Sequence, residues 1–579
     1  MTDARTGPVF TVGDRDFQLD GRPVRLLSGA LHYFRVHEAQ WGHRLAMLRA
    51  MGLNCVETYV PWNLHEPRPG EYRDPEALGR FLDAAQAAGL WALVRPGPYI
   101  CAEWENGGLP HWLTGAVGSG VRTRDPAFLE PVRRWFGRLL PQVVRRQIHH
   151  GGPVLMVQLE NEYGSYGSDR QYLGELAEVL RDAGVTVPLF TSDGPEDHML
   201  TGGSLPGVPA TVNFGSDPAA AFRALRRHRP SGPLMCMEFW CGWFSHWGET
   251  PVPSDAGDAA ATLREILAAG ASVNLYMAHG GTSFAGWAGA NRSGDLHDGA
   301  LQPTVTSYDY GAPLDERGRP TEKFRLFREV LAAHAEEPPP APPPAPPSLA
   351  APVTCALAAW TPLEEVVDAL GGEESVSGRP ATFEELDVDR GLVRYRLRVP
   401  GPRPALPLTL PGARDLVRLY VDGVRTEPGT PVAGPADIEV WVESLGRVNY
   451  GPRLGEPKGL TGGVLHERQY LHGVRARGLR LDAFDDAGAV AALPSRAPEG
   501  TDPGLYRGAV DVQGPGDASL ELPGWRCGFV WVNGFCLGRY RSEGPQHSLY
   551  VPGPVLRRGR NEVWVLETER AGGGTVRLT

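Results

Sequence analysis

Short apolar runs alternate with segments of helical period over the first 335 residues, and this alternation restricts the fold more than any other feature. Eight of the runs are expected to be β-strands, at residues 24–31, 54–60, 91–95, 154–159, 187–191, 211–214, 234–238 and 273–276. Two neighbouring parallel strands need a long crossover connection between them, and this connection is usually a helix. Alternating strands and helices therefore predict a parallel sheet. Eight such units predict a (β/α)8 TIM barrel for residues 1–335.

The segments between the expected strands carry apolar residues on one helical face. In residues 124–149 these residues recur three or four positions apart, at Phe128, Val132, Trp135, Phe136, Leu139, Val143 and Val144. Pro141 is expected to kink this helix. Further helices are expected near residues 38–51, 75–88, 170–182, 258–269 and 322–334, whereas the three glycines and one proline of residues 196–207 disfavour a helix there.

A proline-rich stretch at residues 336–352 separates this region from one with a different sequence pattern. Proline fixes φ and lacks a backbone N–H, so we expect an extended spacer. Beyond it, short alternating strands with frequent Gly and Pro, for example at residues 392–399 and 563–567, predict β-sandwich or jelly-roll domains. We expect a first β domain to start in residues 353–400, and strands from the C-terminus could contribute to it. A β-sandwich at residues 401–500 and a C-terminal β region at residues 501–579 are expected to follow.

The composition excludes several kinds of partner. The formal net charge is -11, and Lys and Arg are scattered among the acidic residues, so no basic stripe predicts nucleic-acid binding. The sequence has neither an apolar leader nor a run of about eighteen apolar residues, which predicts a cytoplasmic protein without a membrane partner. The seven cysteines show no CxxC spacing, and the histidines lack the pattern of a zinc helix. We therefore expect no metal, no disulfide framework and no cofactor.

Three glutamates stand where expected strands end. Glu160 and Glu162 follow the fourth strand, and Glu238 ends the seventh. In a TIM barrel the catalytic groups lie at this end of the strands, and a glycosidic bond is cleaved by two carboxyl groups that flank it. A single strand-end glutamate is more often a solvated rim residue, but two on one face of one barrel favour a glycosidase. Because side chains alternate along a strand, spacing alone leaves Glu160 and Glu162 equivalent.

The sequence around these glutamates resembles glycoside hydrolase family 35, a family of β-galactosidases. The longest similar segment is Gly151-Gly-Pro-Val-Leu-Met-Val-Gln-Leu-Glu-Asn-Glu-Tyr163, and further similar blocks lie at residues 28–35, 58–67, 95–104, 274–276, 306–310 and 524–540. The resemblance implies a (β/α)8 barrel followed by galactose-binding-like β domains. It also implies that Glu162, preceded by Asn161, is the general acid/base and that Glu238 is the nucleophile.

The implied reaction is a double displacement with retention of configuration at the anomeric carbon. Glu238 attacks that carbon while protonated Glu162 donates to the departing oxygen, and Glu162 later takes a proton from water. This chemistry needs carboxyl groups about 5–5.5 Å apart and a raised pKa at Glu162. Asn161 is expected to form a hydrogen bond with the 2-hydroxyl of the sugar.

The resemblance further implies a pocket for one terminal β-linked galactose. Its expected lining is Tyr59, Cys101, Ala102, Glu103, Asn161, Tyr276, Tyr308 and Tyr310. A strand-end tyrosine is as often a packed rim residue, and Cys101 is expected to pack as a small hydrophobe. Arg35 and Arg95 could orient the carboxylates, although an ordinary structural ion pair is the commoner role for either.

Trp240 and Trp243 are expected to frame the mouth of this pocket, since a flat indole stacks on the apolar face of a pyranose. Some bacterial relatives prefer β-1,3-linked galactose, and the tryptophan pair suggests the same preference here. Tyr450 could reach this mouth from the second region, although packing inside a sandwich is the commoner role.

Two other functions stay open on the sequence. A few family relatives accept sugars other than galactose, so another exo-β-glycosidase, such as a β-glucosaminidase, is the alternative within enzymes. A degenerate barrel that only binds carbohydrate is the alternative from another class, and the presence of both Glu162 and Glu238 counts against it. A homodimer is a further hypothesis, because β domains attached to a barrel often pack between subunits.

Overall fold

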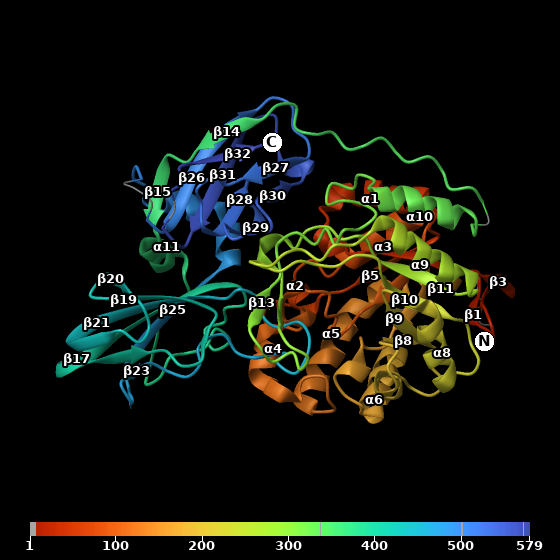
Figure 1. Ribbon diagram of the computed structural model, residues 1–579, viewed down its shortest axis with the longest axis horizontal. Helices are drawn as coiled ribbons and strands as arrows, with labels where there is room; N and C mark the ends of the chain where they lie inside the picture. The colour runs from red at the N-terminus through yellow and green to blue at the C-terminus, as the bar shows by residue number, and fades with distance from the viewer. Residues whose placement is uncertain (1–6, 336, 499–501, 571) are drawn as a thin grey trace.

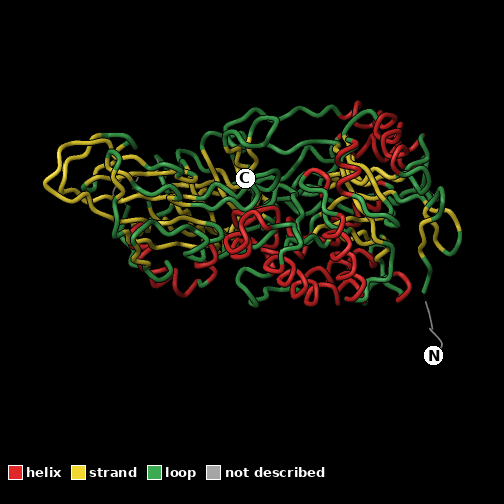
Figure 2. The backbone as a smooth tube through the Cα atoms, turned by 90° about the horizontal axis from the view of Figure 1, so that it is seen from below, coloured by secondary structure: helices red, strands yellow, loops and turns green. Residues whose placement is uncertain are grey.

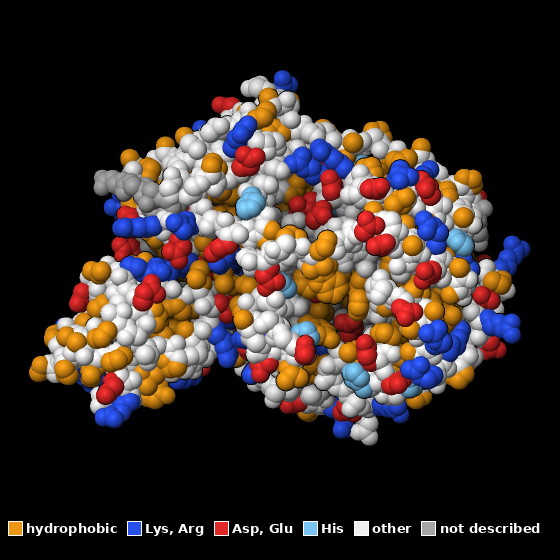
Figure 3. All heavy atoms as spheres, in the orientation of Figure 1, with side chains coloured by type: hydrophobic (Ala, Val, Ile, Leu, Met, Phe, Trp, Pro, Cys, Tyr) orange, Lys and Arg blue, Asp and Glu red, His pale blue; other side chains and the backbone are white. Residues whose placement is uncertain are grey.

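The computed structural model describes residues 7–335, 337–498, 502–570 and 572–579. It shows a barrel formed by the first part of the chain and two β domains beside it (Figure 1). In the view turned by 90°, the helices gather around the barrel and strands dominate the β domains (Figure 2). Acidic and basic side chains are interspersed on the face of the molecule in Figure 3. Within the described residues, no helix is long and apolar enough to cross a membrane.

Eight parallel strands close into a barrel in the order β10-β11-β4-β5-β6-β7-β8-β9. They are β4 (Leu27–Leu31), β5 (Cys55–Tyr59), β6 (Trp91–Arg95), β7 (Val154–Gln158), β8 (Leu189–Asp193), β9 (Ala210–Phe214), β10 (Met235–Trp240) and β11 (Ser272–His279). Nearly all of their residues are buried, because helices cover the outside and side chains fill the inside. The predicted TIM barrel is confirmed.

Helices cover the outer face of the barrel. They are α1 (Trp41–Met51), α3 (Ala77–Ala87), α5 (Pro126–Val144), α6 (Arg170–Asp182), α7 (Asp197–Gly203), α8 (Pro218–His228), α9 (Ala256–Ala268) and α10 (Glu322–Ala332). In α5 the predicted apolar face is the buried one, with Phe128, Trp135 and Phe136 fully enclosed.

Three helices differ from the sequence-based expectation. α5 includes Pro141 but ends at Val144, and a separate 3-10 turn follows at Ile148–His150. α7 forms where glycines disfavour a helix, because its two glycines occupy its last turn while Leu200 is buried against the barrel. α8 was not expected, although Asp217 caps it by accepting a hydrogen bond from a first-turn backbone N–H.

The second domain is an antiparallel sheet of order β16-β25-β17-β21-β19-β20. Its strands are β16 (Ser375–Ser377), β17 (Gly391–Thr409), β19 (Leu416–Val421), β20 (Val424–Thr426), β21 (Pro431–Glu443) and β25 (Val474–Arg480). The boundary expected between residues 400 and 401 falls inside β17 and is wrong. The prolines there shift the register with β21 between Val399 and Arg403, after which the pairing continues.

The third domain takes strands from both sides of the second. β14 (Val353–Ala356) pairs with β32 (Thr575–Leu578), and β15 (Ala359–Pro362) pairs with β26 (Gly504–Val512). The remaining strands of its two sheets are β27 (Ala518–Glu521), β28 (Cys527–Val532), β29 (Phe535–Arg541), β30 (Ser548–Val551) and β31 (Gly559–Glu567). Residues 353–362 therefore lie with the C-terminal strands and apart from residues 391–400.

The described part of the proline-rich stretch, residues 337–352, runs extended from the barrel to the third domain (Figure 1). Arg328 of α10 donates to the carbonyl of Pro339, which holds the beginning of the stretch. The Leu349 N–H donates to the carbonyl of Asp517 in the third domain, which holds its end.

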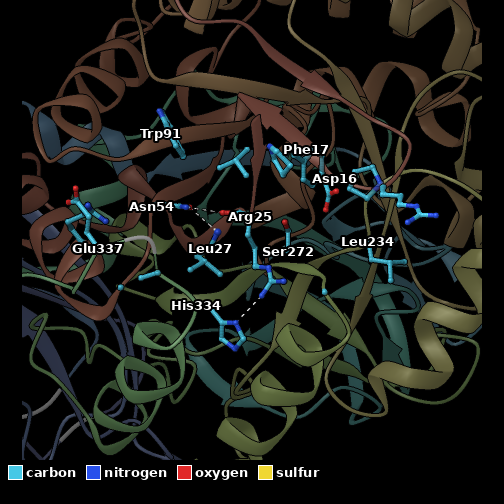
Figure 4. Close-up of a pocket in the computed structure, with 18 of the residues that line it drawn as sticks. Asp16, Phe17, Arg25, Leu27, Asn54, Trp91, Leu234, Ser272, His334 and Glu337 are labelled. Carbon is cyan, nitrogen blue, oxygen red and sulfur yellow. Dashed lines mark hydrogen bonds between the residues drawn. The ribbon is translucent and has the colours of Figure 1, made fainter. Parts of the chain in front are cut away.

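The end of the barrel at which the strands begin holds a cavity of about 420 Å³ (Figure 4). Asn54 ties two strand starts together there, because it accepts from the Leu27 N–H at 2.9 Å and donates to the Arg25 carbonyl at 2.9 Å. The Arg25 guanidinium lies 2.9 Å from Nδ1 of His334. Since Glu160, Glu162 and Glu238 all lie at the opposite end, this cavity is not the site that the sequence predicts.

Arg447 of the second domain is buried against the barrel. Its Nη1 lies 2.8 Å from Oε1 of Glu105, and its backbone N–H donates to Oε2 of the same carboxylate at 2.7 Å. Its Nη2 lies 2.6 Å from Oε1 of Glu384. Two residues on, the Asn449 carbonyl accepts a hydrogen bond from the Tyr99 hydroxyl at 2.6 Å. These contacts fix residues 447–450 at the C-terminal end of the barrel.

We expect Arg447→Ala to lower the free energy of unfolding by about 3–5 kcal/mol, because it leaves two buried carboxylates without their cation. Thermal unfolding followed by circular dichroism measures the loss. The matched control is Arg453→Ala, since Arg453 pairs with Asp298 while both side chains are 47% exposed. There we expect a much smaller loss than in Arg447→Ala, because solvent screens an exposed pair, and equal losses in the two variants would contradict the importance of Arg447.

Candidate active site

A cavity of about 210 Å³ opens at the C-terminal end of the barrel strands. It is lined by Tyr59, Cys101, Ala102, Glu103, Asn161, Glu162, Glu238, Trp240, Trp243, Phe244, Tyr276, Asn291, His297, Tyr310 and Tyr450. The structure thus brings together every residue predicted for the site except Tyr308. Phe244, Asn291 and His297 are additional.

Glu238 ends β10 with only 6% of its surface exposed, and donors surround its carboxylate. Oε1 lies 2.7 Å from Nη2 of Arg95 and accepts a hydrogen bond from the Tyr59 hydroxyl at 2.8 Å. Oε2 accepts from the indole Nε1 of Trp240 at 3.1 Å. These three contacts from the β6, β5 and β10 side chains hold the carboxyl group of Glu238 in a fixed orientation.

Glu162 lies in the loop after β7, in a left-handed backbone conformation with φ 44°. Its Oε1 accepts a hydrogen bond from Nδ2 of Asn213 at 3.0 Å, and Asn213 is itself oriented by the Ser192 hydroxyl at 2.6 Å. Burial and then the negative charge of Glu238 raise the pKa of Glu162 well above its ordinary value. Glu162 therefore keeps its proton to a higher pH than an exposed glutamate does.

Glu160 is bound on the far side of the same loop. Its two oxygens accept from Nε and Nη2 of Arg122 at 3.0 and 2.7 Å, and its Oε1 also accepts from the Tyr172 hydroxyl at 3.0 Å. It does not line the cavity. Spacing in the sequence left Glu160 and Glu162 equivalent. In the structure Glu160 pairs with the buried Arg122, whereas Glu162 lines the cavity.

Asn161 and Glu103 face the cavity from two neighbouring loops. Asn161 Oδ1 accepts from Tyr59 at 2.8 Å and from Arg95 at 2.7 Å, so its orientation is fixed by the partners of Glu238. Burial raises the pKa of Glu103 to about 7, against the lowering effect of a hydrogen bond from Tyr308 and of the charge of Arg35. Glu103 can thus donate as well as accept hydrogen bonds near neutral pH.

Tyr308 was expected in the pocket lining, but it is not among the residues that line the cavity. Its side chain is fully buried, and its hydroxyl donates to Glu103 Oε2. The Arg35 guanidinium lies 3.7 Å from the centre of its ring. Tyr308 therefore supports Glu103 instead of facing the cavity.

Cys101, Ala102 and Glu103 are three consecutive residues with left-handed backbone, at φ 55°, 54° and 47°. Such a run is costly for residues with a Cβ, so the surroundings must hold it. Asn449 of the second domain contributes, because its Nδ2 lies 3.6 Å from the Cys101 sulfur. Burial raises the pKa of this thiol, which fits the packing role expected for Cys101.

The mouth of the cavity is aromatic. Trp240 and Trp243 meet edge to face with ring centres 5.8 Å apart, and Trp243 is 39% exposed. On the other side, Tyr450 of the second domain packs against His297 with ring centres 5.0 Å apart. His297 belongs to the connection between β12 (Ala290–Arg292) and β13 (Leu301–Pro303). Tyr450 thus reaches the mouth, and the mouth combines two domains.

Comparison with known proteins divides the chain in the same places. Residues 16–334 match the model described as "Glycosyl hydrolases family 35", residues 380–480 match "Beta-galactosidase, first all-beta domain", and residues 503–561 match "Beta-galactosidase, galactose-binding domain". The first match alone covers more than half of the chain. The chain belongs to glycosyl hydrolases family 35.

Curated relatives match over nearly the whole chain. A beta-galactosidase of Xanthomonas manihotis is 40% identical over 564 residues, 94% of this chain and 91% of that protein. A beta-galactosidase-1-like protein of Mus musculus is 39% identical, covering 98% of this chain and 90% of its own. A beta-galactosidase of Felis catus is 39% identical, with shares of 96% and 88%. The barrel and both β domains are therefore shared with these relatives of family 35.

The different surroundings of Glu160 and Glu162 predict opposite effects on stability. Glu160→Gln should lower the free energy of unfolding at pH 7 by about 3–5 kcal/mol, because Arg122 is then left buried without its anion. Glu162→Gln should leave stability unchanged or raise it. A carboxyl group whose pKa is raised by folding costs stability above its unfolded pKa of about 4.3, and an amide removes that cost.

Denaturant titrations of both variants at pH 5 and pH 7.5 measure these effects. Circular dichroism spectra in buffer check that each variant is folded. A stability loss in Glu162→Gln as large as that in Glu160→Gln would contradict the distinction between the two glutamates.

Proposed function

We propose that this family 35 protein is a retaining exo-β-galactosidase that releases terminal β-D-galactose from oligosaccharides or glycoconjugates. The observation that carries the proposal is the contrast between two carboxyl groups of one cavity. Glu238 is bound by Arg95 and Tyr59, whereas Glu162 has a neutral amide as its partner and a pKa raised by burial and then by the charge of Glu238. Glycosidic cleavage requires one carboxyl group that attacks carbon and a second that donates a proton. We infer that the sugar is galactose because two of the similar proteins are named beta-galactosidase.

In the first step, a Glu238 oxygen forms a bond to the anomeric carbon while the bond from that carbon to the leaving oxygen breaks. The proton of Glu162 goes to the leaving oxygen, so that the departing sugar or aglycone is neutral. In the second step, Glu162 takes a proton from water, whose oxygen displaces Glu238 from the same carbon. Two inversions give net retention. We assign the hydrogen bond to the 2-hydroxyl to Asn161, and its orientation by Arg95 and Tyr59 supports this role.

The size and walls of the cavity support release of a single terminal sugar. A volume of about 210 Å³ suits one pyranose, and buried polar groups form its floor. Glu103, Asn161 and Tyr276 supply donors and acceptors for sugar hydroxyls. Because the barrel core closes the floor, the cavity favours the end of a sugar chain over an internal sugar.

Replacing each catalytic candidate by alanine should separate the two roles. Glu162→Ala should lower kcat/KM for lactose by about 10²–10⁴-fold, with a smaller loss for aryl galactosides whose leaving group needs no proton. Glu238→Ala should abolish turnover of both substrates. Azide should rescue Glu238→Ala with formation of α-galactosyl azide, and Glu162→Ala with formation of the β-anomer.

Proton NMR of the first-formed product on wild-type enzyme tests retention directly, and β-galactose is expected. Initial formation of the α-anomer would refute the mechanism. Undiminished hydrolysis by Glu238→Ala would refute the assignment of the nucleophile.

The aromatic mouth supports a finer proposal, a preference for β-1,3-linked galactose. Trp240 is anchored through its N–H to Glu238, so its ring has a fixed orientation next to the reacting centre. Trp243 stands beside it, more exposed, where the leaving sugar must lie.

We expect kcat/KM to be higher for Galβ1,3GlcNAc than for lactose, and Trp243→Ala to reduce that ratio. Val252→Ala is the matched control, because Val252 is 56% exposed and does not line the cavity. Equal kcat/KM values of the wild-type enzyme on the two disaccharides would remove the preference.

A further inference from the structure

A third carboxyl group lies inside the barrel beside the Arg95–Glu238 pair. Glu57 is on β5, two residues before Tyr59, and is 0% exposed. Its Oε1 lies 3.8 Å from Nη1 of Arg95. Its Oε2 accepts a hydrogen bond from Nδ2 of Asn274 at 3.4 Å. Glu57 does not line the cavity and lies too deep to touch a substrate.

Arg95 is shared between two carboxyl groups. Its Nη2 faces Glu238 and Asn161, each at 2.7 Å, and its Nε donates to Gln158 at 2.7 Å. The remaining nitrogen, Nη1, is turned toward Glu57. Among the described residues, neither Arg95 Nη1 nor Glu57 Oε1 has a hydrogen-bond partner. Glu57 thus contacts the arginine at a distance that permits Coulombic attraction but no full hydrogen bond.

The groups that face Glu57 come from several strands. The ionisable groups are Arg95 of β6 and Glu238 of β10. Asn274 of β11 is polar, and Tyr59 of β5 stays neutral because burial raises its pKa. His32, after β4, faces Arg95, and burial and then the charge of Arg35 keep its pKa low. Burial raises the pKa of Glu57 itself to about 7. The surroundings therefore supply one cation for two carboxyl groups.

We propose that Glu57 is a positioning residue that shares Arg95 with the nucleophile and thereby sets the electrostatic potential at Glu162 and Glu238. The proposal rests on the proposed function, because it concerns the same pair of carboxyl groups. With Glu57 neutral, the positive charge of Arg95 acts on Glu162 and Glu238 alone. With Glu57 ionised, part of that charge is cancelled, and Glu162 keeps its proton to a higher pH.

The test compares pH profiles of kcat/KM for lactose between wild type and Glu57→Gln. The amide keeps the shape of the side chain but never ionises. On the acidic side Glu57 is neutral in the wild type as well, so the acidic limb should coincide in the two proteins. On the basic side the variant lacks one negative charge, so its basic limb should move to lower pH by about half a unit. A packing defect would instead lower kcat/KM on both the acidic and the basic side of the profile.

Glu57→Asp is the matched control, because it keeps an ionisable carboxyl group in the same place. Its basic limb should stay at a higher pH than that of Glu57→Gln. Thermal unfolding adds a readout that needs no activity. Because folding raises the pKa of Glu57, its carboxyl group costs stability above its unfolded pKa, and this cost is complete above the folded pKa. The Tm of Glu57→Gln relative to wild type should therefore be higher at pH 8 than at pH 5.

The possible results separate the two hypotheses. If wild type hydrolyses β-galactosides but its basic limb coincides with that of Glu57→Gln, the role of Glu57 is refuted and the proposed function stands. An identical displacement of the basic limb in the Gln and Asp variants also refutes it. If wild type hydrolyses no β-galactoside, the proposed function fails. In that case, a Tm difference that does not change between pH 5 and pH 8 would refute the ionisation of Glu57 as well.

Discussion

The ion pair between Arg95 and Glu238 is the interaction on which the site depends. Both side chains are inside a closed barrel, where an unpaired charge would be costly. The guanidinium also orients Asn161 and Gln158, and Tyr59 donates to both Glu238 and Asn161. One buried cation therefore fixes the geometry of the carboxylate and of its neighbouring amide. The aromatic ring of Tyr59, 4.0 Å from the Arg95 guanidinium carbon, completes this arrangement.

The surroundings of Glu162 are the opposite of those of Glu238. Glu162 has no cation within ion-pair distance among the described residues, and a neutral amide, Asn213, is its hydrogen-bond partner. The same loop gives Glu160 a bidentate arginine. Two glutamates two residues apart thus have contrary surroundings, because the loop turns between them through left-handed conformations at Glu160 and Glu162. Backbone geometry, more than side-chain type, therefore gives these two carboxyl groups different partners.

The sequence predicted the barrel well because each strand is a continuous apolar run, and such runs are buried on both sides in parallel sheets. It also offered Glu160, Glu162 and Glu238 as candidates, since these follow strand ends, whereas the choice of Glu162 and the other cavity residues came from the family resemblance. Spacing could not separate Glu160 from Glu162, because the alternation of a strand stops where φ becomes positive. Arg122 and Asn213 were missed as partners, since each is distant in sequence from the glutamate it binds. Tyr308 does not line the cavity, because a strand-end tyrosine can also face the packed layer behind the cavity wall.

The segment that Arg447 holds against the barrel carries Tyr450 to the rim of the cavity, so the second domain contributes to the rim but not to the floor. The floor is built from strand ends whose side chains depend on one another through Arg95. Besides Trp240 and Trp243, the rim includes a loop of the second domain and the connection between β12 and β13. Under the proposed function, changes in these two loops can therefore alter which leaving group is accepted without disturbing the carboxyl groups assigned to bond cleavage. In evolutionary terms, leaving-group selection and bond cleavage can diverge separately in this architecture.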